Sequence, residues 1–134
     1  MRLLLVEDTP DVRRVLAEFL IVSGHEVLEA GTAQSAIDVI STQGCDMVIS
    51  DVHLPDGDCI GVAEIATQKN AAVLLITGDD IFADALAEVG IPHLRKPFGM
   101  KTLALRIDEA APPLQGGASA AGAKFAALRA RIEQ

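Results

Sequence analysis

The amino-acid sequence predicts an α/β protein with a doubly wound parallel sheet of five strands. Two observations predict this fold class. Five short apolar runs alternate along the chain with five segments in which apolar residues recur at helical spacing. The runs are also close to continuously apolar, which is typical of parallel strands covered by helices on both faces. With right-handed crossovers, the expected strand order is 2-1-3-4-5, the flavodoxin-like arrangement.

Each helix expected in the first half begins and ends at residues that favour such ends. The first lies between Pro10, whose missing N–H costs nothing in a first turn, and Gly24. The second begins at Thr32, whose hydroxyl group can cap a helix, and ends at Gly44. The strands of this half are the apolar runs that flank these helices: residues 3–6, 26–30 and 46–51.

The second half continues the alternation. A loop rich in turn-forming residues follows Asp51. Asp79 or Asp80 opens the fourth helix, and Gly90 ends it. The strands expected here are residues 72–77 and 91–95, and the helices run over residues 60–68, from 79 or 80 to 90, and from 98 to about 109.

The composition shifts after residue 110, which we take as the end of the domain. Two prolines and a run of small residues predict a flexible linker over residues 111–123. Beyond it, Phe125 and Leu128 lie at helical spacing among basic residues, so residues 124–134 are expected to form a short amphipathic basic tail helix. Such a short helix is marginal alone in water. Docking on a partner or on the domain, and fraying without a role, both stay open.

Composition and charge exclude several classes of function. Half of the 134 residues are apolar, with four Phe and no Tyr or Trp, so the core of this single domain is mostly aliphatic. The net charge of −8 argues against direct nucleic-acid binding, which needs basic patches. Cys45 and Cys59 have neither metal-ligand spacing nor disulfide density. The N-terminal apolar run is too short for a signal peptide or membrane span, so we expect a cytoplasmic protein that does not bind membranes.

Polar side chains follow four of the five predicted strands. Glu7 and Asp8 follow the first strand, Asp51 ends the third, Thr77 ends the fourth and Lys96 follows the fifth. Each has an ordinary structural role when taken alone, as a helix-start charge, a strand former or a surface cation. In the order 2-1-3-4-5, however, the ligand crevice opens between strands one and three at the carboxyl edge. We therefore expect these five side chains to meet in one pocket.

Three carboxylates in one pocket favour a cation. Two such charges about 4 Å apart repel by about 4 kcal/mol at an effective dielectric constant of 20. A hard divalent ion with oxygen ligands relieves this repulsion, and the donor set suits Mg²⁺. The carboxylate of Asp51 is then placed to act as a nucleophile toward phosphorus and to form an aspartyl phosphate. Lys96 would neutralise charge on the transferring group, and the Thr77 hydroxyl would bind a phosphoryl oxygen.

These residues resemble a known family. The motifs that carry the resemblance are Glu7-Asp8, Asp51, Leu54-Pro55-Asp56-Gly57-Asp58, Thr77-Gly78 and Lys96-Pro97-Phe98. Together they are similar to the receiver domain of two-component response regulators, over about residues 1–110. The resemblance implies phosphoryl transfer to Asp51 from a histidine kinase or a histidine phosphotransfer protein, and a downstream protein target.

The resemblance also assigns residue roles. It implies that Mg²⁺ is held by Glu7, Asp8, Asp51 and the backbone carbonyl of His53. It implies that the phosphoryl group is bound by Val52, Thr77, Gly78 and Lys96, and that the peptide bond before Pro97 is cis. A receiver of this kind is a self-phosphorylating signalling domain with slow autodephosphorylation rather than an enzyme with an external substrate.

The sequence departs from the family pattern at three places. Cys59 stands where a glycine is usual, so the loop after Asp51 is expected to turn differently. His93 stands where the family has its switch aromatic, so Thr77 and His93 are the expected switch residues. The segment between Thr77 and Lys96 is a few residues shorter than usual, and a short or poorly ordered fourth helix is expected there. This is similar to stand-alone receivers and to the receivers of hybrid kinases.

Rival functions lack their required residues. A phosphatase that resembles haloacid dehalogenases needs an aspartate two positions after the nucleophile, where this chain has His53. A flavodoxin-type FMN carrier needs a phosphate loop rich in glycine and hydroxyl groups after the first strand, where this chain has the residues Glu7 to Asp11. Two receiver roles stay open: a free-standing protein-binding module, which we favour, and the N-terminal part of a longer regulator with an output domain.

Overall fold

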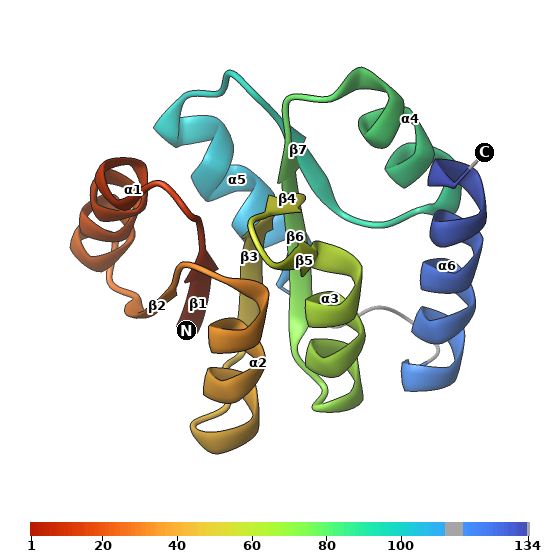
Figure 1. The fold of residues 1–134 in the computed structure, drawn as a ribbon. Helices are drawn as coiled ribbons and strands as arrows, with labels where there is room; N and C mark the ends of the chain where they lie inside the picture. Colours follow the sequence, from red (N-terminus) through yellow and green to blue (C-terminus); the bar gives the residue numbers. More distant parts are fainter. Residues whose placement is uncertain (112–116, 134) are drawn as a thin grey trace.

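The structure, a computed structural model, describes residues 1–111 and 117–133 of the chain. Its centre is a five-stranded parallel sheet in the order β2-β1-β3-β6-β7 (Figure 1). The strands are β1 (Arg2–Val6), β2 (Glu26–Ala30), β3 (Met47–Asp51), β6 (Ala72–Thr77) and β7 (His93–Arg95). Because β4 and β5 form a separate two-stranded hairpin, this is the predicted order 2-1-3-4-5. The flavodoxin-like α/β fold is confirmed.

Helices cover both faces of the sheet. They are α1 (Pro10–Val22), α2 (Ala33–Thr42), α3 (Cys59–Gln68), α4 (Asp80–Val89), α5 (Met100–Ala110) and α6 (Gly117–Ile132). Alternate strand residues point to opposite faces. Leu3 and Leu5 pack with α1 and α5, whereas Leu4 and Val6 pack in the core cluster that includes α2, α3, α4 and α6. Within the described ranges, no helix has the length and apolar character that a bilayer crossing requires.

The loop after β3 forms a small hairpin tied to α2. Strands β4 (His53–Leu54) and β5 (Gly57–Asp58) pair antiparallel, and Cys59 follows as the first, fully buried residue of α3. The side chain of Asp56 accepts hydrogen bonds from the backbone N–H groups of Ala33 at 2.7 Å and Gln34 at 3.0 Å. Asp56 thus caps α2 from another segment and anchors the hairpin that follows the acceptor strand.

Helix α4 is regular, so of the two expected outcomes, a short or a poorly ordered helix, the second is wrong. It has 10 residues, as many as α2 and α3. The side chain of Asp79 caps its first turn, and Gly90 ends it with a φ of 84°, a left-handed conformation that suits glycine. The strand that follows, β7, has only 3 residues.

The C-terminal segment also differs from the prediction. Residues 117–123, expected as linker, are the first turns of α6, so the predicted flexible linker is wrong there and the helix begins well before residue 124. The rest of that linker, residues 112–116, and Gln134 lie outside the described residues. Alanine is the strongest helix former, and Ala121 is buried against the domain. Small residues read as a linker therefore form a docked helix.

Candidate functional site

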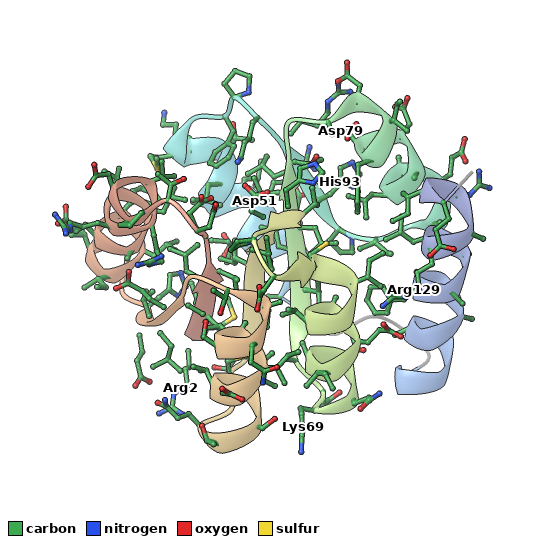
Figure 2. The ribbon with its side chains drawn as sticks, viewed as in Figure 1. Arg2, Asp51, Lys69, Asp79, His93 and Arg129 are labelled. Atoms are coloured by element: carbon green, nitrogen blue, oxygen red, sulfur yellow. The ribbon has the colours of Figure 1, made fainter. Side chains whose placement is uncertain are left out.

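The predicted site residues lie at the carboxyl edge of the sheet. Asp51 is the last residue of β3 and pairs in register with Ile76, the residue before Thr77. Glu7 follows β1, whose last residue pairs with Ser50. Among the described residues, the buried polar side chains are Glu7, Ser50, Asp51 and Thr77, and three of these four belong to the expected pocket. Figure 2 shows Asp51 at this edge, on the same side as Asp79.

Asp51 is held by two donors. Its Oδ1 accepts a hydrogen bond from the backbone N–H of His53 at 2.9 Å, and its Oδ2 accepts one from Lys96 Nζ. Lys96 reaches it because its own N–H donates to the carbonyl of Thr77 at 2.8 Å, which keeps the chain in register beyond β7. The peptide bond between Lys96 and Pro97 is cis, as expected. A carboxylate only 7% exposed is therefore paired with an ammonium group.

The charges of the pocket shift two pKa values. Burial raises the pKa of Glu7, and the charge of Asp51 and a hydrogen bond with Asp8 raise it further, although a hydrogen bond from Thr9 opposes this. Burial lowers the pKa of Lys96, but its hydrogen bond to Asp51 and the negative charge around it outweigh burial, so that the pKa of Lys96 is raised. The pocket therefore has an excess of negative charge that Lys96 only partly compensates.

A preformed magnesium cage is not present. Within residues 1–111 and 117–133, no group of three His, Cys, Asp or Glu side chains is arranged closely enough to hold a metal ion. Glu7 and Asp51 are buried but Asp8 is exposed, and Lys96 occupies one oxygen of Asp51. Like charges separate when only one cation compensates them. By chemistry the set still fits Mg²⁺, because that ion takes carboxylate oxygens and keeps several waters.

Thr77 connects the pocket to α4. Its side chain is 1% exposed, and its Oγ1 accepts a hydrogen bond from the backbone N–H of Asp79 at 2.9 Å. A Cβ added at Gly78 would meet the Lys96 side chain only at 3.7 Å, an ordinary contact, so Gly78 is not required by space. The N–H of Val52, an expected phosphoryl contact, donates instead to the carbonyl of Ile76 at 3.0 Å and extends the sheet.

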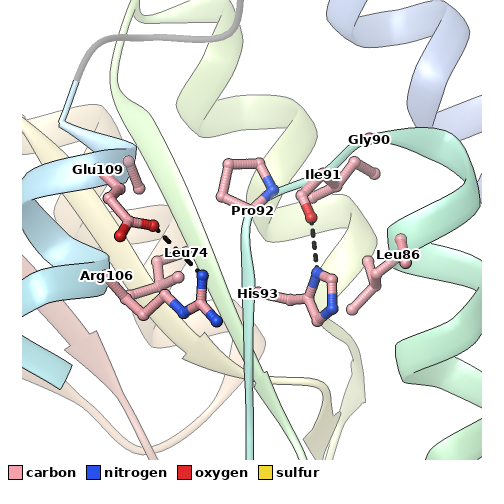
Figure 3. A pocket seen from close by; sticks show the side chains of 10 residues that line it. Leu74, Leu86, Gly90, Ile91, Pro92, His93, Arg106 and Glu109 are labelled. Carbon is pink, nitrogen blue, oxygen red and sulfur yellow. Dashed lines mark hydrogen bonds and ion pairs between the residues drawn. The ribbon is translucent and has the colours of Figure 1, made fainter. Parts of the chain in front are cut away.

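His53 and His93 lie in different surroundings. The exposed ring of His53 turns toward α4, where it meets the Phe82 ring edge-on at 6.2 Å between centroids and has Nε2 at 3.8 Å from Asp79 Oδ2. His93 is half-buried, and its Nδ1 lies 2.9 Å from the carbonyl oxygen of Ile91. It lines a hollow of about 360 Å³ between α4, β7 and α5 (Figure 3), rather than the pocket around Asp51.

The periodicity of the sequence did not predict an apolar groove that lies beside the pocket. Val12 and Val15 of α1 lie at helical spacing with the buried residues Leu16 and Leu20, but they are 44% and 57% exposed. They line a groove of about 570 Å³ that Lys96, Phe98 and Met100 also line. The signal was the width of the apolar pattern: six apolar residues within residues 12–20 exceed what one buried stripe accommodates.

The fold and the pocket together define a class of protein: a flavodoxin-like α/β domain with a buried aspartate at the carboxyl edge of its sheet, paired with a lysine. The comparisons with known proteins agree on the family within that class. The model of the response regulator receiver domain matches residues 3–108. The chain belongs to this family and is a receiver domain of two-component signalling.

Relatives of known sequence are longer than this chain. PdtaR, a transcriptional regulatory protein of Mycobacterium tuberculosis, is 35% identical over 107 residues, which make up 76% of this chain and 52% of PdtaR. FleR, a response regulator protein of Pseudomonas aeruginosa, is 30% identical over 76% of this chain and 23% of FleR. The chain thus spans about half of PdtaR and a smaller part of FleR.

Solved receiver structures have the same fold. The receiver domain of the hybrid histidine kinase CckA is 34% identical, with a TM-score of 0.65 over 83% of this chain and 99% of that one. A putative response regulator from Chloroflexus aurantiacus is 28% identical, with a TM-score of 0.72 over 82% of this chain and 96% of that one.

Proposed function

We propose that Asp51 accepts a phosphoryl group in a Mg²⁺-dependent transfer from a histidine kinase or histidine phosphotransfer protein. The observation that carries this proposal is the pairing of a buried strand-end carboxylate with Lys96. A carboxylate oxygen of Asp51 forms the new O–P bond while the P–N bond of the donor phosphohistidine breaks. The ammonium of Lys96 neutralises charge on the transferring group, and the Thr77 hydroxyl donates a hydrogen bond to it.

The same pocket supports a role for Mg²⁺. We propose Glu7, Asp8, Asp51 and the His53 carbonyl as the groups that would hold the ion, and that it neutralises phosphoryl oxygens when bound. Burial and then the charge of Asp51 raise the pKa of Glu7, and a cation bound between these carboxylates would relieve both effects. Asp8 is exposed and so able to reach an ion that enters from solvent.

The groove beside the pocket offers a place for the phosphodonor. Its apolar lining includes Val12 and Val15 on α1 and Phe98 after the cis proline, and it is continuous with Lys96 and Glu7. A phosphohistidine must approach Asp51 closely, so the protein that bears it must contact the surface around the pocket. We assign the groove to that donor protein, with the exposed valines as its apolar anchor.

The output is proposed as contact with a downstream protein. A phosphoryl group brings a charge near −2 to the pocket and demands hydrogen-bond donors. The Thr77 side chain accepts a hydrogen bond from Asp79 at the start of α4. A movement of Thr77 toward the phosphoryl group would therefore also move the start of this surface helix. Slow hydrolysis of the acyl phosphate would return the domain to its first state. His93 remains the proposed second switch residue, acting at the hollow between α4 and α5.

Labelling by acetyl phosphate tests the proposal. The wild-type chain should gain the mass of one phosphoryl group when Mg²⁺ is present and none when EDTA is added. Asp51→Asn should remain unlabelled, whereas Asp108→Asn, a change of an exposed aspartate on α5, should be labelled as the wild type is. Labelling of Asp51→Asn, or labelling of the wild type without a divalent ion, would contradict the proposed chemistry.

A further inference from the structure

Helix α6 buries an apolar stripe on the face that α3 and α4 present. Phe125 and Leu128 are fully buried and Ala121 is 1% exposed. All three belong to the same core cluster as Phe82 and Leu86 of α4. Figure 1 shows α6, drawn in blue, beside both helices. The face formed by α3 and α4, called the seat below, is therefore a binding surface for an amphipathic helix, and α6 occupies it in this structure.

Basic residues of α6 meet the rim of that seat. Arg129 pairs with Glu64 of α3 at 2.6 Å, and Figure 2 shows its side chain pointing toward α3. Arg131 forms an ion pair with Glu88 of α4. Lys124 Nζ donates a hydrogen bond at 3.1 Å to the carbonyl of the residue that ends α4. Exposed pairs add little affinity, but they set orientation and partner choice, so the seat fits a helix with basic flanks.

The other end of α4 contacts the acceptor pocket. The N–H of Asp79 is bonded to Thr77 Oγ1, and Asp79 Oδ1 accepts from the backbone N–H groups of Ile81 at 2.9 Å and Phe82 at 3.2 Å. The backbone N–H of His53 donates a hydrogen bond to Asp51, and the ring of His53 packs on Phe82. Ten helical residues span about 15 Å. One short rigid helix therefore touches the acceptor pocket at its start and α6 at its end.

We propose that the face formed by α3 and α4 is a docking surface for a basic amphipathic helix, that α6 is its resident ligand, and that phosphorylation of Asp51 weakens the docking of α6. The inference rests on the proposed function of Asp51. Bringing the Thr77 hydroxyl to a phosphoryl group moves the Asp79 amide bonded to it. Close-packed helices do not deform gradually, so α4 shifts as a unit against Phe125 and Leu128.

Hydrogen exchange on the full chain tests this coupling. The exchange of backbone amides in residues 121–132 is measured by mass spectrometry with Mg²⁺ alone, and then with Mg²⁺ and beryllofluoride, which mimics the phosphoryl group. The expected result is severalfold faster exchange in α6 when beryllofluoride is added to the wild type, and no change in Asp51→Asn. Unchanged or slower exchange in the beryllofluoride-bound wild type overturns the proposal.

A fluorine NMR signal from bound beryllofluoride separates the two possible failures. If no bound signal appears, the proposed acceptor function fails and the docking inference falls with it. If the bound signal appears and α6 exchanges as before, the acceptor function stands and the docking inference alone is overturned.

Coupling between two sites is reciprocal, which gives a second test with surface variants. The double variant Arg129→Ala, Arg131→Ala loosens α6 without opening the core. It should bind beryllofluoride about threefold more tightly than the wild type. The control is Arg2→Ala, which removes a pair with Glu26 at 3.1 Å between β1 and β2, away from α6. Equal affinity in the wild type and the double variant overturns the coupling, as does the same gain in the control.

Discussion

The ammonium group of Lys96 donates a hydrogen bond to Oδ2 of Asp51 across 45 positions of sequence. The two residues belong to different strands, and these strands are not neighbours in the sheet. Asp51 ends the central strand β3, and Lys96 follows the edge strand β7, with Thr77 at the end of the strand between them. The pair therefore forms only when the parallel strands are in register, which makes it a sensitive reporter of both fold and chemistry.

Replacing Lys96 should impair phosphorylation far more than folding. Lys96→Met keeps the aliphatic length but removes the charge, and acetyl phosphate labelling should slow by about 100-fold, because a charge-stabilising donor is lost. Rates are followed by intact mass at a fixed Mg²⁺ concentration, with circular dichroism to check the fold. Lys101→Met, a change of an exposed lysine on α5, should label normally. A wild-type rate in Lys96→Met would contradict the role given to Lys96.

Thr77 should be needed for the response of α4. Thr77→Val removes the oxygen that accepts from the N–H of Asp79 and should cost about 1–3 kcal/mol of unfolding free energy in urea titrations. Beryllofluoride should then no longer shift the amide resonances of residues 79–82. Thr77→Ser keeps the hydroxyl and should retain the shifts. Loss of the response in both variants, or in neither, would show that the hydroxyl is not the connection.

The stability contributed by Asp56 should depend on pH. Hydrogen bonds from Gln34 and Ala33 hold the pKa of Asp56 below the ordinary value of 3.8. Because the pKa of Asp56 is lower in the folded than in the unfolded protein, its ionised carboxylate stabilises the fold at pH values above the unfolded pKa. This stabilisation disappears as the pH falls through the folded pKa. The Tm of Asp56→Asn should thus lie below that of the wild type between pH 5 and 7, by a margin that narrows below about pH 4. The difference in Tm between Asp108→Asn and the wild type should not change with pH in this way.

If α6 is buried against the domain, replacing a leucine of α6 by alanine should lower the unfolding free energy more than replacing an exposed leucine of α5. Leu128→Ala on α6 should cost about 2–5 kcal/mol of unfolding free energy, because the side chain is fully buried. Leu105→Ala on α5 makes the same chemical change at a side chain that is 58% exposed, and it should cost about 0.5 kcal/mol or less. Chemical denaturation measures both. Equal costs would mean that α6 does not pack on the domain in solution.

The groove on α1 should matter for a protein donor and not for a small one. Val15→Asp places a charge in the apolar groove and should slow transfer from a phosphorylated histidine phosphotransfer protein about tenfold, while acetyl phosphate labelling stays at the wild-type rate. Val22→Asp, at an 87% exposed position on the same helix, should leave both rates unchanged. If Val15→Asp slows both donors alike, the groove is not a docking surface for the donor.

The sheet and most helices were predictable because local signals and global packing agree. The strands β1, β3 and β6 are almost continuously apolar, and residues such as Thr32 and Gly90 begin or end helices as their chemistry favours. Helix α6 was underestimated because the glycines and small residues of its first half are typical of linkers. The helix propensity of its alanines, together with the contacts of Ala121 and Phe125 with distant helices, explains why this segment is helical.

The pocket shows a similar division. Strand ends brought Glu7, Asp51 and Thr77 to one edge, as topology alone requires. Periodicity, in contrast, could not reveal that Val12 lies outside the buried stripe of α1. Nor could it show that Asp79, an ordinary helix-capping residue by sequence, faces His53 across the mouth of the pocket. Such relationships depend on the angle at which a helix meets its neighbours.

Phe125 is the largest fully buried side chain of the described residues, and it comes from the last helix of the chain. A ribosome makes the protein from its amino end, so the segments around β3 are complete long before this aromatic ring is made. Until residue 125 has left the exit tunnel, the side chains of α3 and α4 that will surround it face water. This half of the core therefore closes only after residue 125 has been made, and nascent chains that stop before α6 should remain prone to aggregation.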